Sequence, residues 1–268
     1  MPEPRIIHCS QQGDFWDRAR CGRITSSRFK DMMAQPISRA SKRGPAGTES
    51  GARDKYRRDV IKERATGRLV DHLVNEAMLD GTKREPFARM LYEAKIQEEC
   101  RMVGFVLHPV WDWFGCSPDG IFSNHGAEFK CPTLDTHISY LLDHSLLLRE
   151  YKWQCMGGLI CFPDLPDWSV STFHPEIRDE AKLMTVWLHR EECEQEIKEL
   201  EERAFEMNEA VEYAIRKMGL PPTIFDIMPG DTPQSKPSDL HSQALLTEED
   251  LPQWWRDKLA VDEREQSV

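Results

Sequence analysis

The 268-residue sequence lacks any run of about 18 apolar residues, so no membrane-spanning helix is expected. Residues 1–16 also lack the apolar core of a secretory signal peptide. Eight cysteines are present, but they contain no CxxC pair and follow no regular framework. This pattern argues against a zinc or iron–sulfur site and is typical of reduced thiols in an intracellular protein. We therefore expect a cytoplasmic protein.

The chain is long enough to bury one core, with room for an appendage, and it needs no disulfides to do so. Its net charge of −11 is distributed unevenly. Residues 18–68 hold fifteen Lys and Arg against five Asp and Glu, a local balance of +10, whereas residues 190–268 hold nine against twenty. One basic segment on an acidic body suits a protein that binds phosphate at one place and repels it elsewhere.

The most informative stretch begins with the sequence SPDG at residues 117–120. Proline, aspartate and glycine in this order are typical of a turn. The following residues 126–131 read as a short strand, whose period of two places Glu128 and Lys130 on one face. Asp119 from the turn can join them. Two carboxylates and one ammonium group that converge in this way predict a site for a divalent metal ion with hard oxygen ligands.

Asp119, Glu128 and Lys130 resemble the signature of the PD-(D/E)xK nucleases. In the form SPDG…EFKCP the stretch is similar to the exonuclease of phage lambda and its relatives, the nucleases of viral recombination systems. The resemblance covers roughly residues 11–220 by the order of short motifs. It implies an α/β fold with a restriction-endonuclease-like core, in which helices flank a mixed central β-sheet. The cysteine spacing argues against the nuclease relatives that carry a four-cysteine cluster.

Residues 14–29 read as a short helix, a glycine stop and the start of a second helix. Thr25, Ser26 and Ser27 are all plausible N-caps of that second helix, and the residues alone favour capping as the role of Ser27. A helix N-terminus with hydroxyl groups is also a natural phosphate site. The resemblance implies this second role, because its pattern W…RxGxITxS assigns the binding of a terminal 5′-phosphate to Arg20 and Ser27.

Residues 36–53 are rich in Gly, Ser, Pro, Lys and Arg, which predicts a loop near DNA. The resemblance implies a further phosphate-binding lysine in this region. Lys42 is the candidate, although spacing within a loop does not decide between it, Arg43 and Arg53. A helix is expected to follow over residues 55–64.

Residues 81–99 predict a helix with Phe87, Met90, Leu91 and Ile96 in its apolar stripe. Glu85 would stand in the first turn of this helix. An acidic residue at that position commonly complements the helix dipole and does nothing more. The resemblance, through the pattern GxxxExxARxxYE, implies instead that Glu85 is a third acid beside the metal.

Further along, a helix is expected to start at Tyr151, and Tyr151 and Gln154 would share one of its faces. The pair alone is typical of the border of a core. In the resemblance, YxxQ follows the catalytic strand and leans over the active site, with Gln154 near the attacking water or the scissile phosphate. The other expected elements are strands over 103–107, 113–116, 127–131 and 168–173, and a long acidic helix over 189–218.

Together these features imply a Mg²⁺-dependent 5′→3′ exonuclease on double-stranded DNA that releases 5′-mononucleotides and leaves 3′ overhangs. Asp119, Glu128, the Phe129 carbonyl and Glu85 would hold two Mg²⁺ ions, with Mn²⁺ as a possible substitute. Lys130 would orient and deprotonate the attacking water, with its pKa lowered by the like charge of the metals. The resemblance further implies a homotrimeric ring around DNA and a single-strand annealing recombinase as partner.

Two alternatives stay open. A structure-specific or single-strand endonuclease would share the chemistry, but it has no need of an end sensor such as Arg20 and Ser27. A catalytically silent DNA-binding adaptor would be expected to have lost one of the acids or the lysine. The expected domain organisation is an exonuclease domain over 1–220, a Pro/Ser-rich linker over 221–246, and an acidic tail with two tryptophans over 247–268.

Overall fold

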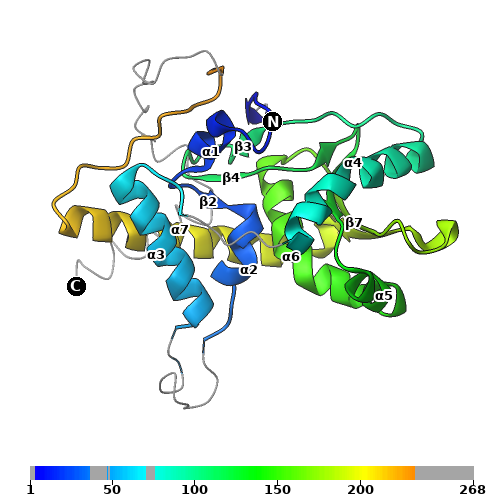
Figure 1. The fold of residues 1–268 in the computed structure, drawn as a ribbon. Helices are drawn as coiled ribbons and strands as arrows, with labels where there is room; N and C mark the ends of the chain where they lie inside the picture. Colours follow the sequence, from blue (N-terminus) through cyan, green and yellow to red (C-terminus); the bar gives the residue numbers. More distant parts are fainter. Residues whose placement is uncertain (1–3, 37–46, 48, 71–75, 233–268) are drawn as a thin grey trace.

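The computed structural model describes residues 4–36, 47, 49–70 and 76–232. Two four-stranded mixed sheets, flanked by helices, form the body of the molecule (Figure 1). The fold class inferred from the sequence is thus confirmed. The first sheet has the order β1-β3-β4-β2, with β1 at Arg5–Ile7, β3 at Phe105–Leu107, β4 at Phe114–Cys116 and β2 at Ile24–Thr25. The second has the order β5-β6-β7-β8, with β5 at Gly120–Ile121, β6 at His125–Lys130, β7 at Asp167–Phe173 and β8 at Leu183–His189.

In the second sheet, β6 and β7 are parallel, and each has an antiparallel neighbour on its other side. Parallel strands need a long crossover, which here consists of α5 (Leu134–Leu142) and α6 (His144–Cys161). The sequence analysis did not anticipate β8, and it placed the start of the following helix too early. The remaining helices are α1 (Asp14–Arg20), α2 (Phe29–Met32), α3 (Gly51–Thr66), α4 (Glu76–Ile96) and α7 (Glu194–Lys217), with short 3-10 turns η1 (Ser26–Arg28), η2 (Asp179–Ala181) and η3 (Arg190–Glu192).

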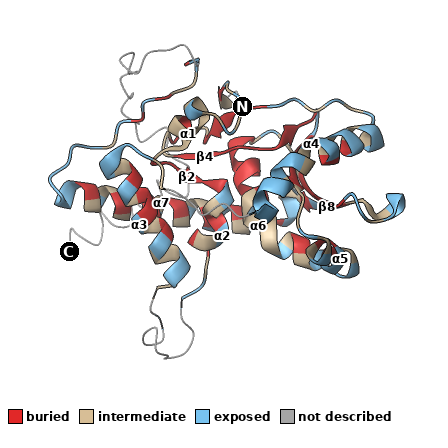
Figure 2. Cartoon of the chain, viewed as in Figure 1, coloured by how far each residue is buried: buried red, intermediate tan, exposed pale blue. Residues whose placement is uncertain are grey.

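Helix α6 is the central element of the core, because it contacts strands of both sheets. Two glycines in its last turns make this close approach possible. A Cβ atom at Gly157 would lie 2.6 Å from the Phe29 ring, and one at Gly158 would lie 2.3 Å from the Trp168 ring. Both rings are fully buried. Figure 2 shows buried residues along α6 and on the elements around it. Glycine at these two positions therefore sets how closely α6 packs between the sheets.

Helices α4 and α6 begin earlier than the sequence analysis expected. Helix α4 starts at Glu76, so Glu85 lies in its interior and not in its first turn. Gly81, which had indicated a helix start, has a packing role: a Cβ atom there would lie 3.1 Å from the carbonyl oxygen of Cys131, at the end of β6. Helix α6 starts at His144, which places Tyr151 and Gln154 in its middle.

The predicted apolar stripe of α4 was wrong for three of its four residues, and only Ile96 packs on a buried cluster. Phe87 and Met90 are 57% and 56% exposed, and Leu91 is 36% exposed. The face that packs on the second sheet instead carries Ala88 and Tyr92, which are 0% and 1% exposed. A small residue and one aromatic ring make this contact, and the bulkier apolar side chains point the other way.

Of the three predicted helix caps near residue 25, Thr25 occupies an N-cap position, that of η1, but without a capping hydrogen bond from its side chain. After Gly22 the chain forms the short strand β2, the 3-10 turn η1 and the four-residue helix α2, and neither η1 nor α2 has a side-chain cap hydrogen bond. Thr25 is instead held by its backbone, because its N–H donates to the Tyr56 hydroxyl at 2.8 Å. The hydroxyl of Ser27 is thus available for other contacts.

Residues 221–232, the first part of the expected linker, pack on the body of the protein. Phe225 and Ile227 are buried, and the Arg23 guanidinium donates to the Ile227 carbonyl at 2.7 Å. The rest of the expected linker and the acidic tail lie outside the described residues, so the predicted domain boundaries stay predictions. Among the described helices, none combines the length and apolar character needed to cross a bilayer.

Candidate active site

The turn before β5 and the strand β6 bring Asp119, Glu128 and Lys130 together. The Lys130 ammonium lies 2.9 Å from Glu128 Oε2 and 3.6 Å from Asp119 Oδ2. The same Asp119 oxygen accepts a hydrogen bond of 2.7 Å from the backbone N–H of Phe129. The Phe129 side chain faces the opposite way, into a cluster with Ala88 and other buried residues. The two carboxylates and the ammonium group therefore form one compact cluster.

Helix α6 contributes two further side chains to this cluster. The Gln154 amide donates to Glu128 Oε2 at 2.6 Å. The Lys130 ammonium lies 5.3 Å from the centre of the Tyr151 ring, within the range of a cation–π contact. Glu128 is only 1% exposed, so these contacts replace water around its carboxylate. Although α6 starts earlier than expected, Tyr151 and Gln154 still lie on one face of it, because residues three apart in a helix are neighbours.

Glu85 approaches the same cluster from α4. Its burial and the nearby charge of Asp119 raise its pKa to about 7, against the opposing effect of Lys130 and Arg89. Burial is also the main cause that raises the pKa of Glu128 to about 8. Three carboxyl groups thus surround one ammonium group in a place with little solvent, where burial and mutual repulsion make three negative charges unfavourable unless a cation balances them.

The pKa of Lys130 is shifted as well. Burial lowers it, but the carboxylates of Glu128 and Asp119 outweigh burial and raise the pKa well above its usual value. The lowering that we expected from the sequence concerns a site that holds metal ions. In the protein by itself the direction is the opposite, and Lys130 is a firmly held ammonium group.

The donor chemistry of the cluster fits a divalent cation. Among the residues that the structure describes, no three acidic, histidine or cysteine side chains stand close enough to form a preassembled metal cluster. The excess of carboxylates over ammonium groups is nevertheless the imbalance that a hard cation such as Mg²⁺ neutralises, and carboxylate oxygens are its preferred protein ligands. Asp119, Glu128 and Glu85 are the residues that would hold it.

A cavity of about 460 Å³ contains the predicted phosphate-binding pair. An Arg20 nitrogen lies 3.2 Å from Ser27 Oγ, and the guanidinium stacks 4.2 Å from the centre of the Trp16 ring. Tyr56 and Arg28 also line this cavity, so its walls carry cationic, hydroxyl and aromatic groups together with the carboxyl groups of three acidic residues, Asp17, Asp59 and Glu63. Such a lining suits a phosphorylated nucleotide end.

Ser117 connects the acid cluster to this cavity and was missed by the sequence analysis. Its hydroxyl accepts hydrogen bonds from Arg20 at 3.3 Å and from the Trp16 indole at 2.9 Å. Ser117 stands two residues before Asp119 in the same turn. That turn is further held by Gln11, whose amide donates to the Pro118 carbonyl at 2.8 Å. The position of Ser117 inside the SPDG motif was the signal that could have identified it.

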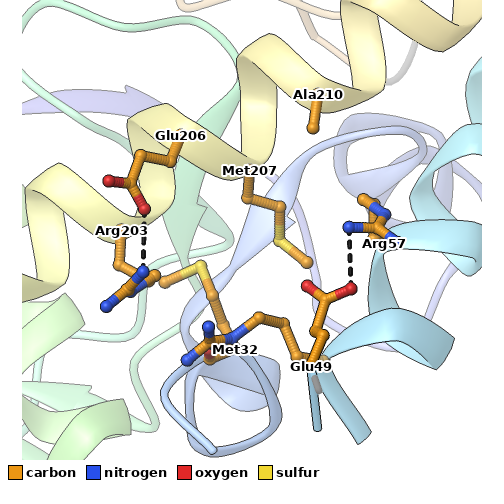
Figure 3. Close-up of a pocket in the computed structure, with 8 residues that line it drawn as sticks. Met32, Glu49, Arg57, Arg203, Glu206, Met207 and Ala210 are labelled. Atoms are coloured by element: carbon orange, nitrogen blue, oxygen red, sulfur yellow. Dashed lines mark hydrogen bonds and ion pairs between the residues drawn. The ribbon is translucent and has the colours of Figure 1, made fainter. Parts of the chain in front are cut away.

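Another cavity, of about 210 Å³, lies between α2, α3 and α7 and contains none of the predicted catalytic residues (Figure 3). Its charges are internally paired: Arg57 contacts Glu49 and Arg203 contacts Glu206, both at 2.8 Å. Arg53 donates to backbone carbonyls, at 2.6 Å in the shorter bond. These contacts are those of a structural junction. Lys42, the predicted DNA-binding lysine, lies outside the described residues.

Comparison with known proteins identifies the family. Residues 15–162, more than half of the chain, match the model of the YqaJ-like viral recombinase domain. No curated protein sequence matches this chain significantly. The crystal structure of an alkaline exonuclease (LHK-Exo) from Laribacter hongkongensis is 28% identical and covers 77% of this chain and 98% of its own, with a TM-score of 0.64.

The same enzyme in complex with dAMP matches with the same identity, coverage and TM-score. A phage-related exonuclease from Haemophilus somnus 129PT is 15% identical, covers 73% of this chain and 96% of its own, and has a TM-score of 0.56, which supports the fold alone. The stretch that matches the family model includes the whole cluster around Asp119 and both residues of the Arg20–Ser27 pair. We conclude that this chain belongs to the family of YqaJ-like viral recombinase domains and has the mixed α/β fold of the alkaline exonucleases.

Proposed function

We propose that this protein is a Mg²⁺-dependent exonuclease that degrades one strand of duplex DNA from its 5′ end. The products would be 5′-mononucleotides and a 3′ single-stranded overhang suited to recombination by strand annealing. One observation carries the proposal: the turn at residues 117–120 joins the cluster around Asp119 and Lys130 to the cavity that contains Arg20 and Ser27. A hydrolytic centre and an end-binding pocket thus share one rigid connection.

The acids have the role of metal ligands in this proposal. Asp119, Glu128 and Glu85, with the Phe129 carbonyl, would hold two Mg²⁺ ions or Mn²⁺ in their place. When bound, Mg²⁺ supplies Lewis-acid stabilisation of the phosphate oxygens and makes a water molecule more acidic. Burial of Glu128 and its contact with Gln154 keep this carboxylate in one orientation.

Lys130 would orient the attacking water and take its proton. Its ammonium group is now held by Glu128 and Asp119, which raise its pKa. Those two carboxylates would be shared with cations in the working enzyme, and the attraction that raises the pKa of Lys130 would weaken. The Tyr151 ring, 5.3 Å away, would limit the movement of the Lys130 ammonium group when metal ions bind to the carboxylates.

Arg20 and Ser27 would hold the terminal 5′-phosphate. Arg20 donates to Ser27 and to Ser117 through different nitrogens, so its planar group is already oriented at the edge of the cavity. The dAMP complex of the Laribacter hongkongensis exonuclease supports a nucleoside monophosphate as the kind of product this fold binds. A contact with the terminal phosphate favours phosphorylated over hydroxyl ends.

A homotrimeric ring and a single-strand annealing recombinase as partner complete the proposal. Both rest on the family resemblance. Light scattering on the purified protein measures the first, and co-purification with a single-strand annealing protein measures the second. A monomer in solution at working concentration would contradict the ring.

The decisive experiment uses linear duplex DNA with one 5′-phosphorylated and one 5′-hydroxyl end, each separately labelled, in Mg²⁺ and then in EDTA. We expect metal-dependent release of mononucleotides, faster from the phosphorylated end and abolished by Lys130→Ala. Internal cuts, or equal attack on both ends, would remove the role of Arg20 and Ser27 and favour an endonuclease. Retained DNA binding without cleavage in either Mg²⁺ or Mn²⁺ would favour the silent adaptor.

A further inference from the structure

Helix α3 has a cationic face that the proposed chemistry does not use. The helix contains six Lys and Arg against three Asp and Glu, a balance of +3. Its exposed charged residues are Lys55, Arg58 and Lys62, whose side chains are 59%, 61% and 63% exposed, and all three are cations. Figure 2 shows exposed residues along this helix. The basic character of residues 18–68 thus reaches solvent along α3.

The three exposed cations form one row. Successive residues of a helix are rotated by about 100°, so positions 55, 58 and 62 fall within about 60° of one another. A rise of about 1.5 Å per residue spreads them over about 10 Å along the helix. Each strand of duplex DNA carries one phosphate per about 3.4 Å of the helix axis. A row of this length can therefore contact two or three neighbouring phosphates of one strand.

Asp59 lies beneath this row and leaves it with an excess of positive charge. Its side chain is 5% exposed and contacts three cations at once. Lys55 lies 2.7 Å away, Lys62 lies 3.8 Å away, and Arg28 approaches from the neighbouring turn at 3.6 Å. One carboxylate shared by three cations does not neutralise them, and it holds the two lysine ammonium groups close together at the surface.

The other two acids of α3 are also engaged below the exposed face. The Glu63 carboxylate is buried and accepts hydrogen bonds from two backbone N–H groups. Asp54 contacts Arg58 and shares its carboxylate with Arg57, which lies 2.7 Å away. Ion pairs between exposed side chains are weak, so a phosphate can replace the carboxylate as the partner of Arg58. The cationic row is thus available to an external polyanion.

The row borders the cavity that contains Arg20 and Ser27. Tyr56 and Asp59 of α3 line that cavity, and the two lysines of the row contact Asp59. A DNA end whose terminal phosphate lies beside Arg20 would therefore bring its adjoining duplex within reach of α3. The cationic face and the end-binding cavity form one continuous surface.

We propose that Lys55, Arg58 and Lys62 on the exposed face of α3 bind the phosphate backbone of duplex DNA behind the end that is being degraded. The identity of the partner as duplex DNA rests on the proposed function, whereas the contact itself needs neither metal nor cleavage. Contacts with phosphates carry no base specificity. They hold the duplex through counterion release, so their contribution to affinity falls as the salt concentration rises.

The test measures equilibrium binding of the full-length protein to a fluorescent duplex with 5′-hydroxyl ends, in EDTA, over a salt titration. EDTA prevents metal-dependent cleavage, and the hydroxyl ends remove the contact with a terminal phosphate. Each phosphate contact contributes about 0.9 to the slope of log K against log salt concentration. The triple variant Lys55→Gln, Arg58→Gln, Lys62→Gln should therefore bind more weakly, with a slope smaller by roughly 2 to 3.

A second triple variant is the matched control. Lys95→Gln, Arg178→Gln and Lys198→Gln remove the same charge, two lysines and one arginine, from exposed positions outside α3. This variant should keep the slope of the wild type. Arg58→Gln alone, which disturbs α3 least, should lower the slope by about 1. Circular dichroism establishes that each variant is folded.

The outcomes separate this surface from the nuclease activity. An unchanged slope for the α3 variant, equal losses in both triple variants, or no duplex binding by the wild type would each overturn the proposal. A loss confined to single-stranded DNA would overturn it in favour of a path for the 3′ overhang. Cleavage in Mg²⁺ is measured separately with the wild type. Its absence, together with the expected change in slope, would refute the proposed exonuclease and leave the α3 surface established.

Discussion

Gln154 offers the sharpest test of the proposed catalytic cluster, because it touches an acid without being a metal ligand itself. Its amide donates to Glu128 Oε2 at 2.6 Å, and Glu128 is 1% exposed. Gln154→Leu keeps much of the side-chain volume and removes the donor. A hydrogen bond to a buried charged group is worth about 1.5–3 kcal/mol. At about 1.4 kcal/mol per factor of ten, the loss of this hydrogen bond should lower the rate of DNA degradation roughly 10- to 100-fold.

The loss should be visible in the Mg²⁺ dependence of the reaction. Without Gln154 the Glu128 carboxylate keeps its contact with Lys130 but loses its second donor to Oε2. We expect the carboxylate to be less well oriented, with a higher Mg²⁺ concentration at half-maximal rate and a lower maximal rate. The assay is mononucleotide release from 5′-phosphorylated duplex DNA over a Mg²⁺ titration. Thermal unfolding followed by circular dichroism establishes that the variant is folded.

Glu150→Gln is the matched control for Gln154→Leu. Glu150 lies one turn earlier on α6, where it pairs with Lys30, and its side chain is 42% exposed. Its substitution should leave the rate and the Mg²⁺ dependence within about twofold of the wild type, since exposed ion pairs contribute little. A folded Gln154→Leu variant with wild-type rate and Mg²⁺ dependence would refute the positioning role.

Three other predictions concern packing, pH and metal removal. Gly158→Ala would place a Cβ atom 2.3 Å from the fully buried Trp168 ring and should destabilise the fold by about 1–3 kcal/mol in urea unfolding. Gly51→Ala is the control. A Cβ atom added at Gly51 would meet no other atom within 4 Å, so this substitution should be neutral or slightly stabilising. The hydrogen bond to Asp167 at 2.7 Å raises the pKa of His189. The stabilisation of the fold by protonated His189 is therefore fully present below about pH 6.5 and is lost as the pH rises through the raised pKa. His189→Gln should therefore reduce the free energy of unfolding more at pH 5.5 than at pH 8.5, by less than about 1 kcal/mol because the side chain is partly exposed. EDTA should stop DNA degradation and leave the far-ultraviolet circular dichroism spectrum unchanged, because backbone hydrogen bonds and apolar packing hold the described helices and strands together.

Each of these predictions has a clear contrary result. Equal unfolding free energies for Gly158→Ala and Gly51→Ala would mean that α6 can shift away from Trp168. A pH-independent effect of His189→Gln would show that its ion pair with Asp167 does not form in solution. Loss of helical signal in EDTA would make the metal a structural component of the fold.

The meeting of Asp119, Glu128 and Lys130 was predictable because it depends on local sequence. Asp119, Glu128 and Lys130 lie within twelve residues, and a turn followed by a strand of period two leaves little freedom in how they meet. The family-like patterns around Arg20 and Gln154 likewise led to side chains that the structure places beside this centre. Their catalytic and binding roles remain predictions that the experiments above test.

Other features were decided by tertiary packing. The apolar spacing favoured Phe87 and Met90 as buried residues of α4, but Ala88 and Tyr92 pack on the sheet, whereas Phe87 and Met90 are exposed. Gly81, taken from the sequence as a helix start, is instead the point where α4 approaches the end of β6. The contact of Ser117 with Arg20 joins residues 97 positions apart. The sequence alone determined which groups could do chemistry, because residue type and short spacing are local. Only the tertiary structure decided which faces are buried and which distant groups meet, because those outcomes depend on the shape of the surfaces that pack together.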